Sequence, residues 1–299
     1  MAKPFIKWVG GKSQLIPEIT QRLPEYVKNG KPYIYVEPFS GSAAVALHLL
    51  DSGHPPSAII LNDINTDLVN LYKVVKSNPH ELLAYLKTLQ VEYDELEDKE
   101  AKQPYYYTKR EEFNTREADD IKHAGLFIFL NRAGFNGLYR VNSKNKFNVP
   151  IGSYKKPNFV FEDIILQASK VLANVEIYNQ SYEDTLSHLE QFNKSNLPAF
   201  FYFDPPYKPL SESSSFTSYS KDSFADADQE KLKSFCDSLH KKGYQWLLSN
   251  SDTSNLNDKK SFFDTLYSQY KIERVQAIRS INSKGSKRGK INELLIRNY

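Results

Sequence analysis

A short apolar run that ends at a carboxylate and two prolines constrains this chain more than any other stretch. Residues 199–203, Ala-Phe-Phe-Tyr-Phe, are typical of a buried β-strand, and Asp204-Pro205-Pro206-Tyr207 follows directly. Neither proline has an N–H to donate, so the chain must leave the sheet just past Asp204. Ligands of open α/β sheets bind at that edge. An acidic, aromatic pocket there suits a planar base with an exocyclic amino group, although an ordinary strand ending in a turn shares the pattern.

Two more predicted strands end at acids near the start of the chain. A strand over residues 34–36 leads into a tight turn that begins at Glu37, and a helix of small residues follows at 43–50. A second strand, 58–61, is followed within two residues by Asp63. An acid in that place holds ribose hydroxyl groups in Rossmann-type sites. The turn lacks a dinucleotide fingerprint, but this order favours an adenosine-containing ligand over a plain βαβ unit with acids facing solvent.

A glycine turn near the N-terminus, Gly10-Gly11-Lys12-Ser13, has part of a phosphate-binding P-loop pattern. That motif needs a glycine where Ile6 stands, which argues against a P-loop ATPase. The turn could still offer backbone N–H groups and Lys12 to an anionic group such as a carboxylate. The alternative is a turn that only packs beside the sheet. Ser13 is expected to cap a helix that follows.

The middle of the chain departs from the alternation of strands and helices. Residues 65–123 show helical periodicity, which predicts a helical insertion. Two short strand-like pieces, 138–141 and 146–149, follow between glycines and a proline and predict a polar, basic hairpin. Further strands are expected at 175–178, 245–249, 275–278 and 293–297, the last two as an antiparallel pair that closes the sheet.

Basic residues are concentrated in two segments that contain no acid. Residues 125–161 and 274–292 carry six Lys or Arg each, although the net charge of the whole chain is only +3. Both segments are also rich in Asn, Ser, Gly and aromatic residues. A charge run is usually a solvated face, but two such segments favour a polyanion that both contact, and we infer nucleic acid.

Composition limits the class of protein further. Hydrophobic residues make up 40% of the chain and charged residues 25%, and no apolar run is long enough to cross a membrane. The start of the chain lacks the pattern of a signal peptide, and the single cysteine, Cys236, forms no disulfide within the chain. A reducing cytoplasmic location is therefore expected. The six histidines lack metal-ligand spacing, so no metal site is expected.

A serine-rich stretch, residues 210–220, follows the expected pocket directly. Its low complexity is typical of a flexible loop. It could be a lid that orders when substrate binds, and an idle surface loop is equally compatible with this composition.

Several short motifs, taken in order, resemble the series found in Dam-type DNA adenine-N6 methyltransferases (D12 class, α group). They are residues 5–12 (Phe-Ile-Lys-Trp-Val-Gly-Gly-Lys), 37–42 (Glu-Pro-Phe-Ser-Gly-Ser), 62–63 (Asn-Asp), 204–207 (Asp-Pro-Pro-Tyr) and 248–251 (Leu-Ser-Asn-Ser). In this group the target-recognition region lies between the cofactor and catalytic motifs. Residues 135–150 and 152–155 are similar to the recognition hairpin of members that methylate adenine in GATC.

The resemblance implies an α/β fold with a Rossmann-like mixed β-sheet, helices on both faces, and a helical and β-hairpin target-recognition domain. Residues 1–70 and 160–299 would form the catalytic domain that binds S-adenosyl-L-methionine, and residues 71–159 the inserted recognition domain. The implied enzyme is a site-specific adenine methyltransferase that acts on double-stranded DNA without a metal. Whether it pairs with a restriction endonuclease or acts alone stays open.

The resemblance also assigns roles to single residues. Trp8 and Lys12 would hold the methionine end of the cofactor. Glu37 and Asp63 would lie along its amino-acid and ribose portions. Tyr182 would lie near its adenine.

At the catalytic motif, Asp204 would touch both the cofactor and the target base. The Pro205 carbonyl, fixed by its neighbour Pro206, would accept a hydrogen bond from the adenine amino group, and Tyr207 would stack on the flipped base. Residues expected to contact DNA are Asn136, Leu138, Arg140 and Tyr154, with support from the basic loop 284–290. Cytosine-N4 methylation is a related alternative, but its enzymes more often carry Ser in place of Asp204. A DNA-binding protein without catalysis is the other alternative.

Overall fold

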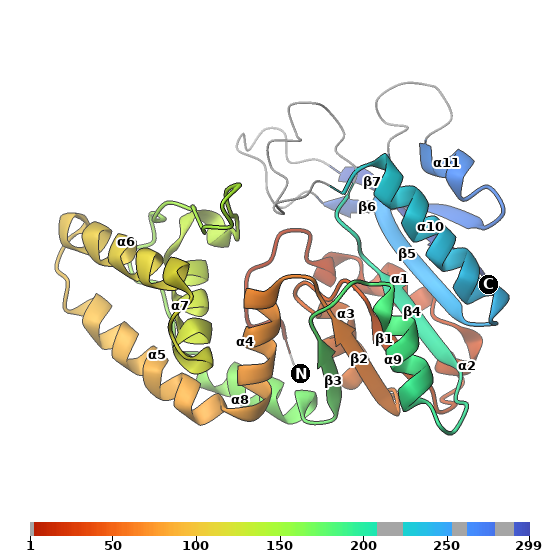
Figure 1. The fold of residues 1–299 in the computed structure, drawn as a ribbon, viewed down its shortest axis with the longest axis horizontal. Coiled ribbons are helices and arrows are strands. Elements are labelled where there is room, and N and C mark those ends of the chain that lie inside the picture. The colour runs from red at the N-terminus through yellow and green to blue at the C-terminus, as the bar shows by residue number, and fades with distance from the viewer. Residues whose placement is uncertain (1–2, 208–223, 253–261, 279–289) are drawn as a thin grey trace.

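The computed structural model describes residues 3–207, 224–252, 262–278 and 290–299. Within them, seven strands form one sheet in the spatial order β3-β2-β1-β4-β5-β7-β6 (Figure 1). Strands β1 to β5 are parallel to one another, whereas β7 runs antiparallel to both β5 and β6. This mixed sheet, covered by helices, confirms the predicted Rossmann-like α/β class.

The strands agree closely with those predicted from the sequence. They are β1 (Ile34–Glu37), β2 (Ala58–Asn62), β3 (Val175–Tyr178), β4 (Ala199–Phe203), β5 (Gln245–Ser251), β6 (Lys271–Ile278) and β7 (Lys290–Arg297). The last three are longer than expected because they pair with one another beyond their apolar centres. Strand β4 ends just before Asp204 and the two prolines, as their missing N–H groups require.

Among the described residues, helices cover both faces of the sheet, and three more extend beside it. They are α1 (Ile16–Gln21), α2 (Glu25–Lys28), α3 (Ala44–Leu50), α4 (Thr66–Ser77), α5 (Pro79–Asp94), α6 (Lys99–Thr115), α7 (Asp120–Ala133), α8 (Glu162–Leu172), α9 (Asp184–Phe192), α10 (Asp226–Lys241) and α11 (Phe262–Leu266). None of these described helices has the length and hydropathy needed to cross a lipid bilayer.

Side chains alternate between the two faces along each strand, which divides the core in two. Phe200 and Tyr202 of β4 pack into the core that contains α3, α4 and α8. Phe201 and Phe203 pack into the other core, with α9, α10 and α11. This period of two is the reason that an unbroken aromatic run forms a strand buried on both faces.

The helices α5, α6 and α7 extend to one side of the sheet (Figure 1). The segment that follows α7 contains the predicted hairpin, whose pieces 138–141 and 146–149 pair only briefly and form no regular strands. It forms an irregular hairpin with two isolated bridges, Gly134 to Ile151 and Val141 to Phe147. Asn114 of α6 binds the outer edge of this hairpin: its side chain accepts from the Phe147 N–H at 2.7 Å and donates to the Phe147 carbonyl at 3.1 Å. A side chain thereby takes the place of a neighbouring strand.

The start of the first helix also differs from the prediction. Residues Lys12–Gln14 form a 3₁₀ turn, η1, and α1 begins after Leu15 with no side-chain cap. Pro17 lies in the first turn of α1, where a missing N–H has no cost, so the helix begins there and not at Ser13.

Leu248 tests the packing of the central strands. Its side chain is fully buried on β5, beside Phe203 of β4 and Ile296 of β7. We expect Leu248→Ala to lower the free energy of unfolding by about 2–5 kcal/mol, measured by urea denaturation, because it leaves a cavity that rigid strands cannot close. Val91→Ala, at a position that is 58% exposed on α5, should change it by less than about 0.5 kcal/mol. Equal losses in the two variants would contradict this description of the core.

Candidate active site

Acids from three strands meet at one edge of the sheet. Glu37 ends β1, Asp63 follows β2 and Asp204 follows β4, and these strands are adjacent and parallel. Their proximity has an electrostatic consequence. Burial raises the pKa of Glu37 well above its usual range, and the charges of Asp204 and Asp63 raise it further. The structure therefore brings together the three acids that the sequence placed at strand ends.

A buried lysine faces this acidic edge. Only 6% of Lys12 is exposed, and its Nζ lies 2.9 Å from Oδ1 of Asp204. The same ammonium donates to the Gly10 carbonyl at 2.7 Å and lies 4.3 Å from the ring centroid of Tyr207. A nitrogen donor therefore occupies the space beside the Asp204 carboxylate and over the aromatic ring.

Asp204 also receives a hydrogen bond from the next strand. Oγ of Ser249 on β5 donates to Oδ1 at 3.0 Å, and the hydroxyl of Tyr202 lies 3.0 Å from the same Oγ. Burial raises the pKa of Asp204, whereas the charge and hydrogen bond of Lys12, and then Ser249, act to lower it. This carboxylate is thus held in place by two donors from different elements.

The rest of the Asp-Pro-Pro-Tyr segment is fixed by residues distant in the sequence. The hydroxyl of Tyr207 donates to Oε2 of Glu293 on β7 at 2.7 Å. Nε2 of the buried Gln229 on α10 donates to the Pro206 carbonyl at 3.2 Å, and Asn250 in turn donates to Oε1 of Gln229. Sequence reasoning missed Gln229 and Glu293, because no local pattern marks them, whereas Asn250 lies in the motif 248–251.

Glu37 and Asp63 brace the turn that follows β1. Glu37 accepts from the Tyr35 hydroxyl at 3.1 Å and from the Ala46 N–H at 3.2 Å. Asp63 accepts from the N–H groups of Gly41 and Asn65, both at 2.9 Å. Burial raises the pKa of Asp63, and these backbone hydrogen bonds oppose the rise. Both acids therefore have a structural role that the strand pattern alone did not show.

Aromatic rings flank this turn on two sides. Trp8 packs against Gly41, where an added Cβ would lie 3.1 Å from Cδ1 of the indole and φ is +45°. Tyr182 stacks on Phe39 with ring centroids 5.2 Å apart, and burial raises its pKa to about 12. Acids, backbone N–H groups, flat apolar rings and a glycine without a side chain suit an amino acid joined to an adenosine. The donor set thus fits S-adenosylmethionine.

The residues expected to contact DNA lie along the irregular hairpin, with different exposure. Asn136 is exposed and has a left-handed backbone, φ 55°, and Leu138 is partly buried against the core. Nε of Arg140 donates to Oδ1 of Asn148 at 2.7 Å. Tyr154 is 37% exposed.

Lys7 was missed by sequence reasoning, although it contacts one of these residues. Its Nζ donates to the Tyr154 hydroxyl at 3.2 Å and lies 4.4 Å from the ring centroid. Buried Asn131 on α7 explains how Lys7 reaches the hairpin. Its amide donates to the carbonyls of Lys7 and Gly137 at 2.8 and 2.9 Å, and its Oδ1 accepts from the Lys7 N–H. One side chain thereby ties the N-terminal segment to the hairpin.

Two expected features fall on residues that the structure does not describe. The serine-rich stretch, 210–220, and residues 284–289 of the basic loop lie outside the described ranges. Arg274, at the start of the second basic segment, is described and contacts two acids. Its guanidinium lies 3.0 Å from Asp252 and 2.7 Å from Asp264, so this charge is offset locally.

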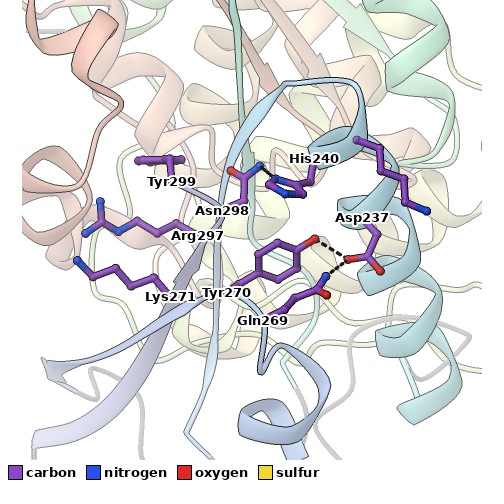
Figure 2. A pocket seen from close by; sticks show the side chains of 9 residues that line it. Asp237, His240, Gln269, Tyr270, Lys271, Arg297, Asn298 and Tyr299 are labelled. Carbon is purple, nitrogen blue, oxygen red and sulfur yellow. Dashed lines mark hydrogen bonds between the residues drawn. The ribbon is translucent and has the colours of Figure 1, made fainter.

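A separate cavity of about 530 Å³ lies at the opposite edge of the sheet, where β5 begins and β7 ends (Figure 2). Its polar groups are largely paired with one another. Asp237 accepts from Tyr270, Gln269 and Lys233, and Asn298 contacts His240. This cavity is not part of the acidic site. Among the described residues, no cluster of three or more His, Cys, Asp or Glu side chains could hold a metal ion.

Comparison with known proteins relates this geometry to one family. A family model described as D12 class N6 adenine-specific DNA methyltransferase matches residues 8–281. The type II methyltransferase M.MjaIII of Methanocaldococcus jannaschii is 43% identical over 300 residues, which cover 99% of this chain and 99% of that protein. The type II methyltransferase M1.LlaDCHI of Lactococcus lactis subsp. cremoris is 35% identical, with 99% and 95% covered. A DNA adenine methylase of Escherichia coli strain K12 is 36% identical, with 98% and 94% covered.

Glu37 gives a test of the electrostatics at this edge. Glu37→Gln removes the charge but keeps an oxygen to accept from Tyr35 and Ala46. Since folding raises the pKa of Glu37, the unfolded chain ionises first as the pH rises, which favours unfolding. We expect the variant to be more stable than the unmodified protein at neutral pH, with a difference that shrinks as the pH falls toward 4.5, the ordinary pKa.

Urea denaturation across this pH range measures the effect. Glu25→Gln is the matched control, because the Glu25 side chain is 80% exposed on α2 and should give little change at any pH. A stability difference for Glu37→Gln that does not vary with pH would contradict the expected burial of its charge.

Proposed function

The chain belongs to the D12 class of N6 adenine-specific DNA methyltransferases, and from this premise we propose that it methylates N6 of adenine within GATC in double-stranded DNA. The proposed methyl donor is S-adenosyl-L-methionine. One observation carries the proposal: a nitrogen donor, Nζ of Lys12, already lies 2.9 Å from Asp204 and 4.3 Å from the centroid of Tyr207. An adenine with its amino group on Asp204 and its ring on Tyr207 needs the same acceptor and the same ring.

The cofactor would lie along the turn between β1 and α3. When bound, it supplies an electrophilic methyl group. Trp8 and Lys12 would hold its methionine end, with Glu37 beside the amino acid. Asp63 would accept from the ribose hydroxyl groups, because its backbone hydrogen bonds already hold it at this turn. Tyr182 would flank the adenine, and its stacking on Phe39 keeps that wall flat.

The target adenine cannot be reached inside a duplex, so it would be flipped out of the stack. Tyr207, anchored through Glu293, would stack on it. Asp204 and the Pro205 carbonyl would accept hydrogen bonds from N6, while Pro206 restricts the backbone between them and the ring. These acceptors would favour a pyramidal nitrogen whose lone pair points at the methyl group that the cofactor supplies. The N–C bond would form as the bond between that methyl group and the sulfonium sulfur breaks, leaving S-adenosyl-L-homocysteine, and N6 would release a proton to solvent. Positioning and electrostatics then supply most of the rate enhancement.

The amino group of the target would replace the ammonium of Lys12 on Asp204. Burial raises the pKa of Asp204, so an unpaired carboxylate is unfavourable there, and a second donor must take over when Lys12 leaves. Exchange of one nitrogen donor for another keeps the carboxylate hydrogen-bonded throughout.

Sequence recognition would come from the irregular hairpin in residues 71–159, the proposed recognition domain. Asn136 is exposed and the Leu138 side chain is partly buried. Arg140 is held by a hydrogen bond to Asn148, and Tyr154 by one from Lys7. Bidentate Arg contacts to guanine are the commonest specific contacts in the major groove. Residues 1–70 and 160–299 would form the catalytic domain. The enzyme would act in the cytoplasm, alone or with a restriction endonuclease.

Transfer of labelled methyl from S-adenosyl-L-methionine to duplex oligonucleotides tests the proposed function. The two duplexes differ only in GATC against GTAC. We expect label in N6-methyladenine on the GATC duplex alone. Label in N4-methylcytosine would favour the related cytosine chemistry, which the Asp at position 204 argues against. DNA binding without any transfer would indicate a non-catalytic DNA-binding protein.

Asp204 gives the sharpest test of the proposed mechanism. Asp204→Ala removes the acceptor, so we expect methyl transfer to fall by at least about 100-fold while the protein stays folded. Asp163→Asn, at an exposed position on α8, is the control and should retain full activity. Steady-state transfer to the GATC duplex measures both, with circular dichroism to verify folding. Near-normal turnover by Asp204→Ala would rule out this mechanism.

Arg140 tests the proposed recognition. Arg140→Ala should reduce discrimination between GATC and a duplex changed at one base pair by about 1–3 kcal/mol, if a bidentate guanine contact is lost. Lys156→Ala removes an exposed charge nearby and should weaken binding to both duplexes equally. Ratios of kcat/KM for the two duplexes measure the effect. An unchanged ratio in Arg140→Ala would exclude Arg140 from base recognition.

A further inference from the structure

A buried carboxylate outside the proposed active site joins the two proposed domains. Asp67 lies in the first turn of α4, with 4% of its surface exposed. It accepts from three donors, all in the inserted segment 71–159. These are Nη2 of Arg116 at 3.0 Å, Nε2 of His123 at 2.9 Å and the hydroxyl of Tyr139 at 2.6 Å.

The electrostatics of Asp67 show how strongly these donors act. Burial alone would raise its pKa, but the hydrogen bonds of His123 and Tyr139 and the charge of Arg116 lower it below the usual range. Arg116 makes its contact from a left-handed backbone, φ +54°, at the end of α6. Such a conformation is strained for a residue with a side chain and persists where surrounding contacts determine it. The cluster is therefore a rigid connection.

On one side, this connection leads to the proposed cofactor site. Asp63 accepts from the Asn65 N–H, and Asn65 caps α4 by accepting from the Leu68 N–H at 3.0 Å. Asp67 lies within the turn that this cap begins. The acid proposed to hold the ribose and the carboxylate of the cluster thus share one short, hydrogen-bonded segment.

On the other side, the connection leads to the recognition hairpin. Tyr139 stands between Leu138 and Arg140 in the chain, so its side chain fixes the backbone from which both project. Its ring also packs on Trp8, with centroids 5.5 Å apart. Tyr139 therefore contacts Asp67 through its hydroxyl and Trp8 through its ring, and both of these residues lie next to the proposed cofactor site.

We propose that Tyr139 is a positioning residue whose hydrogen bond to Asp67 couples the DNA site to the cofactor site, so that each ligand strengthens binding of the other. This inference rests on the proposed function. Because the connection is rigid, DNA that fixes the position of the hairpin would also fix the position of the segment 63–67, and the cofactor bound at this segment would fix the hairpin. Such coupling is reciprocal by thermodynamic necessity.

Tyr139→Phe tests the proposal by removing only the hydroxyl. The measurement is the Kd of S-adenosyl-L-homocysteine by calorimetry, without and with saturating GATC duplex. For the unmodified protein we expect the duplex to tighten binding by about fivefold or more. In Tyr139→Phe this factor should fall by about half or more, because the hydrogen bond between the hairpin and Asp67 is lost while Arg116 and His123 keep their contacts with Asp67.

Tyr106→Phe is the matched control. Tyr106 is also buried, and its hydroxyl donates to the Val149 carbonyl of the same hairpin at 3.0 Å, but from α6 and without contact to Asp67. Loss of that hydroxyl should loosen the hairpin and leave the coupling factor unchanged. The GATC/GTAC discrimination ratio, measured on the same three proteins, should fall most in Tyr139→Phe.

The outcomes separate this inference from the proposed function. If the unmodified protein transfers no methyl group and binds no S-adenosyl-L-homocysteine, the proposed function fails. If it is active but Tyr139→Phe keeps the full coupling factor, the role of Tyr139 is wrong. An equal loss in Tyr106→Phe would also overturn the proposal, because it would indicate general loosening of the hairpin.

Discussion

The pairing of one buried ammonium with one partly buried carboxylate governs the geometry of the proposed site. Lys12 and Asp204 lie 2.9 Å apart where three acids crowd the same edge of the sheet. An isolated charge in either position would be costly, because burial disfavours ionised groups that lack a partner. The glycine turn, the end of β4 and Ser249 must therefore keep their relative positions, and Tyr207 is held against the same lysine.

This constraint depends on backbone features that the sequence expresses directly. Five apolar residues followed by Asp-Pro-Pro predict both a buried strand and its end, because prolines cannot continue the pairing. The acids after β1 and β2 could be placed at the same edge for a similar reason, since parallel strands align their carboxyl ends. Most strands were predicted from the same kinds of local pattern.

Contacts between distant segments could not be predicted in this way. The hairpin was predicted from its own sequence, but its outer edge is held by Asn114, which lies more than 30 residues away in the chain. Gln229 and Glu293 support the Asp-Pro-Pro-Tyr segment from other elements. The histidines show no metal-ligand spacing in the sequence, so His123 was not expected to have a particular role. It donates to Asp67 because α7 packs against α4. Such partners are chosen by the tertiary fold, which leaves no periodic signal.

In the proposed reaction, the target base takes the place of Lys12 on Asp204. The most direct measurement is a crystal structure of the protein with S-adenosyl-L-homocysteine and a duplex containing GATC. We predict an extrahelical adenine stacked on Tyr207, with its amino group on Asp204 and the ammonium of Lys12 displaced. An adenine that stays paired in the duplex, with Lys12 still on Asp204 and the cofactor product bound elsewhere, would contradict this prediction.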